Sequence, residues 1–336
     1  KYWSQFKTGA IKRGVSKSIA LKIFNKFSGQ YMFPESHAYA FGITAYQMSW
    51  IKHYYPLEFF IAIFNQQPMG FYNLETLKED AKRHGIYPLN IDINKSLVEC
   101  APKDNNSFLL GLSMTKGISN TNADHIVRNR DSEGPFLSIT DTVNRLNLNY
   151  LALKNLARAG AFDTFTPNRR SALWEIGLIY RPASIQLSLP LSIEQDRVTL
   201  PNMSDWEKMA GEYDTTNLYP QGHLMEILRP NMSAKILTSA EIPKVPNRSK
   251  VTVAGLVIRR QHPRSHKIFL TLEDEYGHIS IIVLPKVFNR YRNVLSQPVL
   301  KIIGTVSKTQ DNVNIVASII ENIYVDDPLP PAKNWE

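Results

Sequence analysis

The sequence contains one cysteine, Cys100, and no long apolar run. A single cysteine excludes an internal disulfide and a cysteine-based zinc site. The most apolar stretch, around 59–64, is far shorter than the roughly 18–20 residues of a membrane-spanning helix. The first residues, Lys1-Tyr-Trp-Ser-Gln-Phe, lack the apolar core of a signal peptide. These absences predict a cytoplasmic protein that does not interact with a membrane.

Acidic residues are missing from two segments of the chain. Residues 1–30 contain seven lysines and arginines and no Asp or Glu, and the same holds for residues 242–272. The net charge is +9, so the rest of the sequence is mildly acidic. Ordinary surfaces mix the two signs, whereas a polyanion-binding surface concentrates positive charge, since each neutralised phosphate releases counterions. The segments therefore favour nucleic-acid binding; the alternative is that they are solvated helix and strand faces.

The motifs of several enzyme classes are also absent. There is no Gly-x-x-x-x-Gly-Lys-Ser/Thr loop, no Gly-x-Ser-x-Gly and no His-Glu-x-x-His. Two-metal phosphoryl transfer needs closely placed carboxylates, and the densest acidic cluster, Glu273-Asp274-Glu275, lies in a predicted strand turn, where a solvated hairpin is expected. His262 and His266 flank a proline in a loop, which argues against a metal pair. The sequence predicts neither a catalytic residue nor a metal site in this chain.

The order of helix and strand signals predicts a multidomain α plus β protein. Residues 1–107 are predicted to form one domain. Residues 1–66 have helical apolar spacing, with Pro56 starting one helix, and Asn73 caps another that stops at Gly85 before an extended piece at 86–93. Residues 108–180 contain two pairs of short helices around tight turns. Residues 181–248 are rich in Pro, Ser and Asn and are predicted to be a linker with small helices.

The remaining sequence has the character of strands. Residues 249–325 contain five mostly β-branched runs with a helix after the third, which is the order of a five-stranded OB-fold barrel. Residues 326–336 contain three prolines and are predicted to be a flexible tail.

The turn Lys116-Gly117-Ile118-Ser119 resembles the Gly-hydrophobic-Gly hairpin of a helix-hairpin-helix motif, with Ser119 in place of the second glycine. Such a glycine lets the backbone approach a phosphate, and the amides of the following helix start bind the anion. A second unit ends in Ala159-Gly160-Ala161. Since two such units commonly pack as one clamp, Lys116, Gly117, Ser119 and Gly160 are predicted to contact the backbone of duplex DNA. The alternative is an ordinary helical hairpin.

The first hairpin of the barrel is strongly basic. Its first strand ends in Arg259-Arg260-Gln261-His262-Pro263-Arg264, and the next begins at His266-Lys267-Ile268-Phe269. An OB-fold binds single strands across this face and its first loop, with cations for phosphates and aromatic rings for stacking. The predicted single-strand contacts are Arg259, Arg260, Arg264, Lys267 and Phe269. The alternative is a basic edge strand without a ligand.

Residues 186–191 read Gln-Leu-Ser-Leu-Pro-Leu within the predicted linker. They closely resemble the bacterial sliding-clamp-binding hexapeptide Gln-Leu-x-Leu-x-Leu. An extended peptide of this kind can place its side chains in apolar pockets of a partner, so Gln186, Leu187, Leu189 and Leu191 are predicted to bind a clamp. The alternative is an apolar linker that packs on its own domain.

One long segment carries a family resemblance. It reads Phe33-Pro-Glu-Ser-His-Ala-Tyr-Ala-Phe-Gly-Ile-Thr-Ala-Tyr-Gln-Met-Ser-Trp-Ile-Lys-His-Tyr-Tyr-Pro-Leu-Glu-Phe-Phe and resembles the fingers motif of bacterial DNA polymerase III alpha-like, C-family enzymes. The Pro34-Glu35 pair and the segment Asn65-Gln-Gln-Pro-Met-Gly-Phe-Tyr are similar to the error-prone, ImuC-type branch. Further matches at Gly134-Pro-Phe, Thr271-Leu-Glu-Asp-Glu-Tyr-Gly and Leu284-Pro-Lys-Val-Phe extend the resemblance over essentially the whole chain.

The resemblance implies a C-terminal portion of such a polymerase. The parent enzyme would be a DNA-directed DNA polymerase that extends primer-template DNA with dNTPs in translesion synthesis and DNA-damage repair. Its palm, with the catalytic aspartates and Mg²⁺, would precede Lys1, so this chain is expected to bind no cofactor and to be inactive alone. Mutasome proteins would be further partners.

The resemblance to the fingers motif also implies which residues lie near the DNA. The resemblance places Ser36, His37 and Tyr39 near the nascent base pair and lets Lys52 reach a DNA phosphate; the alternative is core packing within the fingers. A different hypothesis is a freestanding DNA-binding accessory protein without polymerase activity. An RNA-binding OB protein is a weaker one, because it leaves the fingers motif unexplained.

Overall fold

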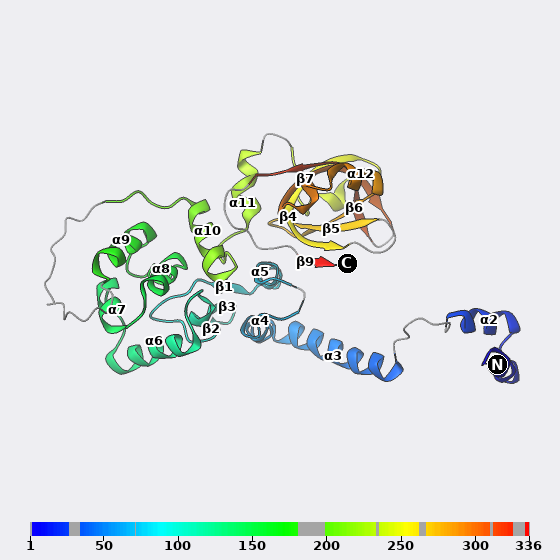
Figure 1. The fold of residues 1–336 in the computed structure, drawn as a ribbon, viewed down its shortest axis with the longest axis horizontal. Coiled ribbons are helices and arrows are strands. Elements are labelled where there is room, and N and C mark those ends of the chain that lie inside the picture. The colour runs from blue at the N-terminus through cyan, green and yellow to red at the C-terminus, as the bar shows by residue number, and fades with distance from the viewer. Residues whose placement is uncertain are drawn as a thin grey trace. The chain divides into compact units, whose positions relative to one another are not determined.

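The computed structural model describes residues 2–26, 34–70, 72–180, 199–232, 235–261, 267–309, 312–324 and 333–335. The chain forms two compact units, Lys1–Tyr55 and Pro56–Glu336, whose elements are shown in Figure 1. The boundary falls inside the range 1–107 that the sequence assigns to one domain. It lies at Pro56, which lacks a backbone N–H and separates two successive helices.

The first unit contains α1 (Tyr2–Lys12), α2 (Lys17–Lys26) and α3 (Glu35–Tyr54). Trp3 and Phe6 of α1 pack against Phe24 of α2, with ring centroids 5.0 and 5.6 Å from it. α3 buries none of its 20 residues, although apolar side chains lie all around it. Such helices are normally buried in a larger core. Among the described residues, no helix is both long and apolar enough to cross a membrane.

Local capping signals set the start of the second unit. α4 (Pro56–Asn65) begins at its proline, and α5 (Leu74–Arg83) is capped by Asn73, whose side chain accepts a hydrogen bond of 2.8 Å from the amide of Thr76. Gly85 follows α5 with a φ of +76°. These ends confirm the two helices predicted at Pro56 and Asn73. A small sheet follows, with β1 (Tyr87–Leu89), β2 (Ala101–Asp104) and β3 (Ser107–Leu109) in the order β1-β3-β2.

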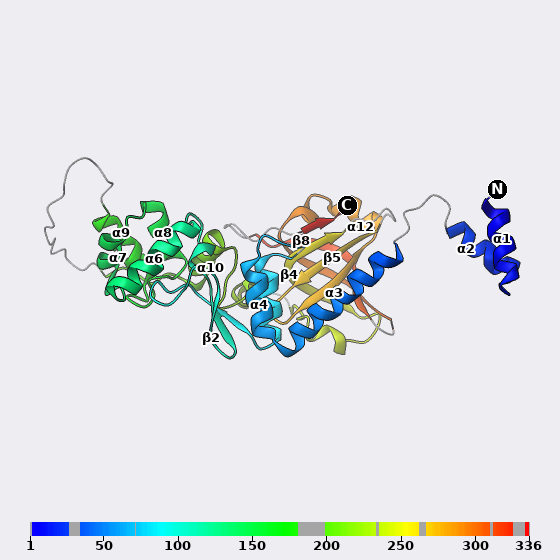
Figure 2. The ribbon, with the colours of Figure 1, turned by 90° about the horizontal axis from the view of Figure 1, so that it is seen from below.

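Four helices build the next layer of the unit: α6 (Asn120–Glu133), α7 (Ile139–Arg145), α8 (Tyr150–Arg158) and α9 (Arg169–Ile179). They lie together in both views of the ribbon (Figure 1 and Figure 2). The side chains of Ser119, Ser138, Asn149 and Asn168 each accept a hydrogen bond from the backbone of the helix that they precede. Polar caps thus fix the four helix starts, and the inward-facing apolar residues form one core.

The range 181–248, predicted to be a linker, contains two packed helices. α10 (Asp205–Thr216) begins with a capping box between Ser204 and Glu207, and α11 (Leu224–Leu228) follows. Met209 and Tyr213 of α10 are buried in a core shared with the first barrel strand. The content of Pro, Ser and Asn suggested a linker with small helices, yet these helices pack their apolar side chains into the protein. Residues 181–198 lie outside the described residues.

α5 joins the helical layer to the rest of the unit through buried polar contacts. Lys78 is fully buried and forms ion pairs with Glu75 (2.8 Å) and Glu79 (2.5 Å). Its ammonium also donates hydrogen bonds to the carbonyls of Tyr219 and Gly222, at 2.9 and 2.5 Å. This charged helix is therefore an internal element of the unit.

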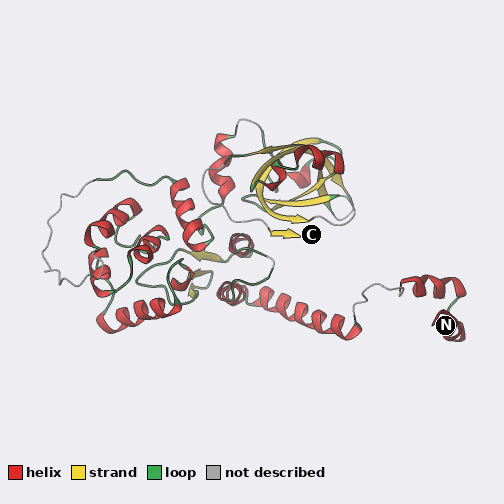
Figure 3. Cartoon of the chain, in the orientation of Figure 1, coloured by secondary structure: helices red, strands yellow, loops and turns green. Residues whose placement is uncertain are grey.

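The barrel has the strand order expected of an OB-fold. β4 (Lys250–Gln261), β5 (Ile268–Glu273), β6 (His278–Val283), β7 (Val299–Lys308) and β8 (Val313–Asn322) pair in the order β5-β6-β8-β7-β4, and β5 closes the barrel against β4. α12 (Pro285–Tyr291) follows the third of these strands, and Figure 3 shows it against the barrel. The predicted multidomain α plus β fold with a five-stranded OB-fold is confirmed.

A sixth strand comes from the predicted flexible tail. β9 (Lys333–Trp335) pairs in parallel with Arg259–Gln261 at the end of β4. These three residues therefore join the sheet by backbone pairing, which the composition of the tail does not reveal. The rest of the tail, 325–332 and 336, lies outside the described residues.

Candidate nucleic-acid interface

The first hairpin is an exposed turn between a buried residue and a helix start. Gly117 has a φ of +88°, which an L side chain rarely adopts, and both Gly117 and Lys116 are exposed. Ile118 is buried beneath the turn, and Ser119 caps α6 by accepting a hydrogen bond from the amide of Asn122. The turn therefore presents a glycine backbone beside a helix N-terminus, the arrangement that suits a phosphate.

Two other helices hold this turn in place. The amide of Lys116 donates to the carbonyl of Thr215 at 2.8 Å, and the side-chain amide of Asn155 donates to the carbonyl of Lys116 at 2.7 Å. The Lys116 ammonium lies 3.2 Å from Asp214, which also pairs with Arg158. Burial raises the pKa of Asp214, but the hydrogen bonds from Arg158 and Lys116 have the larger effect. They hold the pKa of Asp214 below its ordinary value. These contacts hold the turn in position without a ligand.

The second hairpin is not exposed in the same way. Gly160 has a φ of +87° and is buried. A Cβ at this position would lie 2.5 Å from Nη2 of Arg169 and 2.9 Å from Oδ2 of Asp163. The glycine thus makes room for an ion pair inside the protein. Its contact with DNA stays a prediction, and the structure provides a separate structural reason for a glycine here.

Arg169 is the central residue of that ion pair, and sequence analysis missed it. Its guanidinium pairs with Asp163 and with Glu212 of α10, at 2.8 and 2.7 Å. Burial lowers the pKa of Arg169, but the hydrogen bond to Asp163 and the charge of Glu212 have a larger opposite effect. The pKa of Arg169 is therefore raised above its ordinary value. Burial also raises the pKa of Glu212 to about 7, although Arg169 lowers it. Nothing in the sequence links α9 to α10, so no local pattern could have found this pair.

The outer face of the barrel brings several predicted residues together. Arg259 is paired with Thr271 across the strands, Gln261 with Phe269, and Phe269 with Ile282. Arg259, Lys267 and Phe269 are all exposed. Cations therefore flank an accessible aromatic ring on neighbouring strands, as a single-strand site requires. Arg264 lies outside the described residues.

Arg260 has a different environment from Arg259. Its guanidinium donates hydrogen bonds to the carbonyls of Leu295, Ser296 and Gln297, at 2.8, 3.0 and 2.6 Å. Burial lowers the pKa of Arg260. These bonds hold the segment after α12 against the end of β4. A DNA contact for Arg260 stays a prediction, and the three carbonyls account for its position without a phosphate.

The prediction that the acidic turn between β5 and β6 is a solvated hairpin is wrong. Glu273 and Asp274 are fully buried. Glu273 accepts a hydrogen bond from Thr76 of α5 at 3.3 Å, and both the amide and the hydroxyl of Ser239 donate to Asp274 at 2.6 Å. Tertiary partners far away in the sequence explain the burial. Among the described residues, no group of three His, Cys, Asp or Glu side chains could hold a metal ion.

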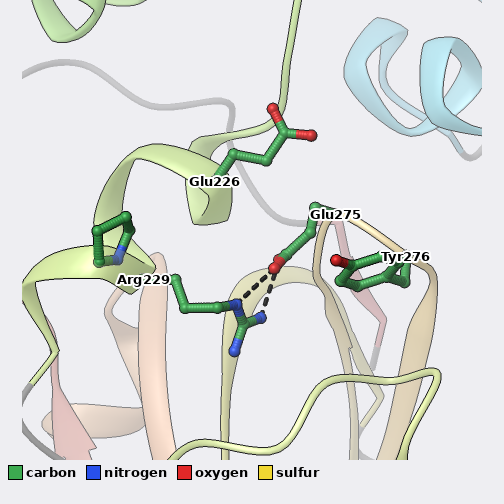
Figure 4. Close-up of a pocket in the computed structure, with 5 residues that line it drawn as sticks. Glu226, Arg229, Glu275 and Tyr276 are labelled. Carbon is green, nitrogen blue, oxygen red and sulfur yellow. Dashed lines mark hydrogen bonds and ion pairs between the residues drawn. The ribbon is translucent and has the colours of Figure 1, made fainter.

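The third acid of this turn lines a cavity of about 430 Å³. Figure 4 shows Glu275 pointing toward Arg229 of η2 (Arg229–Asn231), with Glu226, Pro230 and Tyr276 completing the lining. Arg229 forms ion pairs with both Glu275 and Asp274. The carboxylates balance the charge of Arg229, so the lining has no excess positive charge to attract an anion.

In the first unit, the fingers-motif residues lie on α3. Ser36 and Tyr39 are exposed, whereas His37 and Lys52 are half-buried. The His37 ring lies edge-on against Phe41, with centroids 4.4 Å apart. Tyr39 and Tyr46 line a shallow hollow along the same helix. The four predicted residues thus share one helix, and their roles stay predictions. The predicted clamp-binding residues, Gln186 to Leu191, lie outside the described residues.

Two family models match parts of the chain. Residues 85–172 match a helix-hairpin-helix motif, and residues 251–323 match an OB-fold nucleic acid binding domain. Curated relatives that match the chain carry the description error-prone DNA polymerase. The protein of Anaeromyxobacter dehalogenans is 36% identical over 91% of this chain, that of Burkholderia pseudomallei 35% over 96%, and that of Brucella abortus 31% over 94%. The chain spans 28 to 31% of the length of these relatives.

Proposed function

We propose that this chain is the DNA-binding C-terminal portion of an error-prone, ImuC-type C-family DNA polymerase. The main support for this proposal is that the chain is similar to error-prone DNA polymerases over more than nine-tenths of its length. The parent enzyme would extend primer-template DNA with dNTPs past lesions, in the cytoplasm. The first hairpin would bind the duplex backbone, and the outer face of β4 and β5 would bind the single strand.

The exposed surface of α3 favours this function over a freestanding accessory protein. A helix with apolar side chains all around it is stable in water only when other parts of a protein cover it. In a larger polymerase, the rest of the fingers and the palm would supply that cover. A freestanding protein of this sequence would leave Tyr39, Tyr46 and Trp50 to solvent.

The Mg²⁺ of the proposed polymerase reaction does not fit the carboxylates described in this chain. Glu273, Asp274 and Glu275 each already bind a hydroxyl, an amide or a guanidinium of the protein. We therefore assign Mg²⁺ and the catalytic aspartates to a palm domain outside this chain, and we expect the chain alone to bind no cofactor. Mutasome proteins are proposed as partners of the complete enzyme.

The hairpin assignment can be tested with Gly117→Asp. A carboxylate at the exposed turn would repel a phosphate and strain a backbone with positive φ, so duplex affinity should fall about tenfold or more, which is about 1.4 kcal/mol. Fluorescence anisotropy with duplexes of unrelated sequence would measure it, and the loss should not depend on sequence.

The control for this variant is Gly134→Asp at the other end of α6. Gly134 has a φ of +85° and open space around it, so the charge and the backbone strain are the same. An equal loss of duplex affinity in both variants would refute the hairpin assignment. Thermal unfolding of each variant would show that the fold is retained.

We also propose that Gln186, Leu187, Leu189 and Leu191 bind a bacterial sliding clamp. Tethering to a ring already on DNA would raise the effective concentration of a salt-sensitive DNA-binding chain. Replacing Leu189 and Leu191 by alanine should abolish clamp binding and leave DNA binding unchanged. Calorimetric titration against a clamp would decide it, and equal heats for wild type and variant would exclude the motif.

A further inference from the structure

The two ends of the barrel differ in charge. The turn between β5 and β6 carries Glu273, Asp274 and Glu275, and each of these acids is paired within the protein. The opposite end is formed by the end of β4, the start of β5 and the end of β6. Residues 276–310 contain five lysines and arginines and no acid. The acidic turn thus separates two basic stretches of the sequence, 242–272 and 276–310.

The strand register places α12 at the basic end. Ile268, the first residue of β5, pairs with Val283, the last residue of β6, and α12 begins two residues later at Pro285. The other edge of β5 pairs with the end of β4, where Gln261 lies opposite Phe269. The hydrogen bonds of Arg260 bring the segment after α12 to the same strand end. α12 therefore lies beside the predicted single-strand contacts.

α12 has an apolar side and a basic side. Val287, Phe288 and Tyr291 pack against the barrel core. Lys286 and Arg290 are exposed one turn apart, and Arg292 is exposed just beyond the helix. In the part of the chain that the structure describes, none of the three forms an ion pair with an acid, whereas Lys301 on β7 is paired with Glu321. Their charges are available to an anionic partner.

We propose that Lys286, Arg290 and Arg292 form a second phosphate-binding surface, which extends the single-strand site from the β4–β5 face onto α12. This rests on the proposed function of the barrel. A nucleic-acid strand fits because its phosphates repeat along a line, and cations continue from Arg259 and Lys267 to α12. Since an OB-fold occupies about 4–16 nucleotides, a longer strand crosses the open β face and reaches the helix, whereas a short one stays on the face.

The test uses the full chain and oligothymidylates of about 4 and about 16 nucleotides, the ends of the OB-fold range. The variant replaces Lys286, Arg290 and Arg292 by alanine. Its affinity for the longer strand should fall about tenfold, and the log–log salt dependence should flatten by about 0.7 for each phosphate that is no longer neutralised. Its affinity for the shorter strand should stay within about twofold of wild type, because that strand does not reach α12.

The matched control replaces Lys95, Lys103 and Lys235 by alanine. These three lysines are also exposed, and they lie outside both acid-free basic segments, 1–30 and 242–272. The net charge changes equally in both triple variants. An equal loss of affinity in both would mean that only overall charge matters, and this would overturn the proposal. An equal loss for both oligonucleotide lengths would also overturn it, since α12 would then not be an extension.

Arg259→Ala separates this inference from the proposed function. If Arg259→Ala weakens single-strand binding and the α12 variant does not, the α12 surface is refuted and the barrel function stands. If wild type binds neither oligonucleotide, the barrel function itself fails. Should the alanine variant lose its cooperative unfolding transition, a triple glutamine variant repeats the comparison. Preference of the same residues for an acidic peptide over the longer strand would overturn the assignment to nucleic acid.

Discussion

Replacing Lys78 by methionine should destabilise the second unit by about 3–5 kcal/mol, the cost of breaking a buried ion pair from one side. Methionine has a similar length but cannot donate a hydrogen bond. Two buried carboxylates, Glu75 and Glu79, and two backbone carbonyls would lose the same ammonium. At about 2–4 °C for each kcal/mol in a unit of this size, the melting temperature should fall by roughly 10 °C. Differential scanning calorimetry would measure it.

The stability lost in Lys78→Met should also depend on pH. Burial raises the pKa of Glu75 above its ordinary value of 4.5, although the charge of Lys78 lowers it. A raised carboxyl pKa contributes stability below the unfolded-state pKa, and this contribution is lost as pH rises through the folded-state pKa. Without Lys78 the pKa of Glu75 rises further. The difference between variant and wild type should therefore be smallest below about pH 4.5 and should grow as pH rises.

Lys82→Met provides the control for Lys78→Met. Lys82 lies one turn further along α5, is partly exposed and is 3.5 Å from Glu79. A pair of this kind contributes about 1 kcal/mol or less, so the melting temperature should change little. Equal shifts for the two variants would show that the charge of α5, and not the burial of Lys78, matters.

Gly160→Ala should destabilise the helical layer by about 3–5 kcal/mol, as expected when a buried ion pair is displaced. The new Cβ would lie 2.5 Å from Nη2 of Arg169, whose guanidinium is fixed by Asp163 and Glu212. The positive φ of Gly160 adds about 1–2 kcal/mol of backbone strain. Chemical denaturation followed by circular dichroism would measure the change in the free energy of unfolding.

Gly134→Ala isolates the backbone part of this effect. Its φ of +85° nearly equals that of Gly160, and nothing lies within 4 Å of its Cβ position. Gly134→Ala should therefore cost only the strain of about 1–2 kcal/mol. If the two alanine variants are equally stable, the contact with Arg169 is not what requires a glycine at position 160.

Elements with strong local signals could be predicted from the sequence. Pro56 and Asn73 start helices for reasons of backbone chemistry that act within one turn. The five β-branched runs and the helix after the third determine the strand order of the barrel. Along β5, strand alternation also places Phe269 on the outer face. In β4, however, Val253 and Val257 face the barrel core, and Arg259 reaches the outer face only after the register shift that follows Val257. Each of these inferences depends on neighbours in the chain, which the sequence displays directly.

The burial of charged side chains depends on distant partners, which the sequence does not display. Glu273 reads as an exposed turn residue, yet Thr76, almost 200 residues earlier, donates a hydrogen bond to it. Lys78 likewise lies under the carbonyls of Tyr219 and Gly222, more than 140 residues later in the chain. A charged side chain looks the same in a sequence whether water or a buried partner satisfies it. Only the tertiary structure distinguishes the two, and for the same reason Arg260 could not be told from Arg259.

The buried trio Glu75, Lys78 and Glu79 also constrains how this protein can evolve. A neutral replacement of Lys78 alone leaves two buried carboxylates without their cation, whereas either glutamate can be lost while the other still pairs with Lys78. A well-packed apolar replacement of the whole group can be neutral or stabilising. Related chains are therefore expected to lose the lysine only where both carboxylates are lost as well.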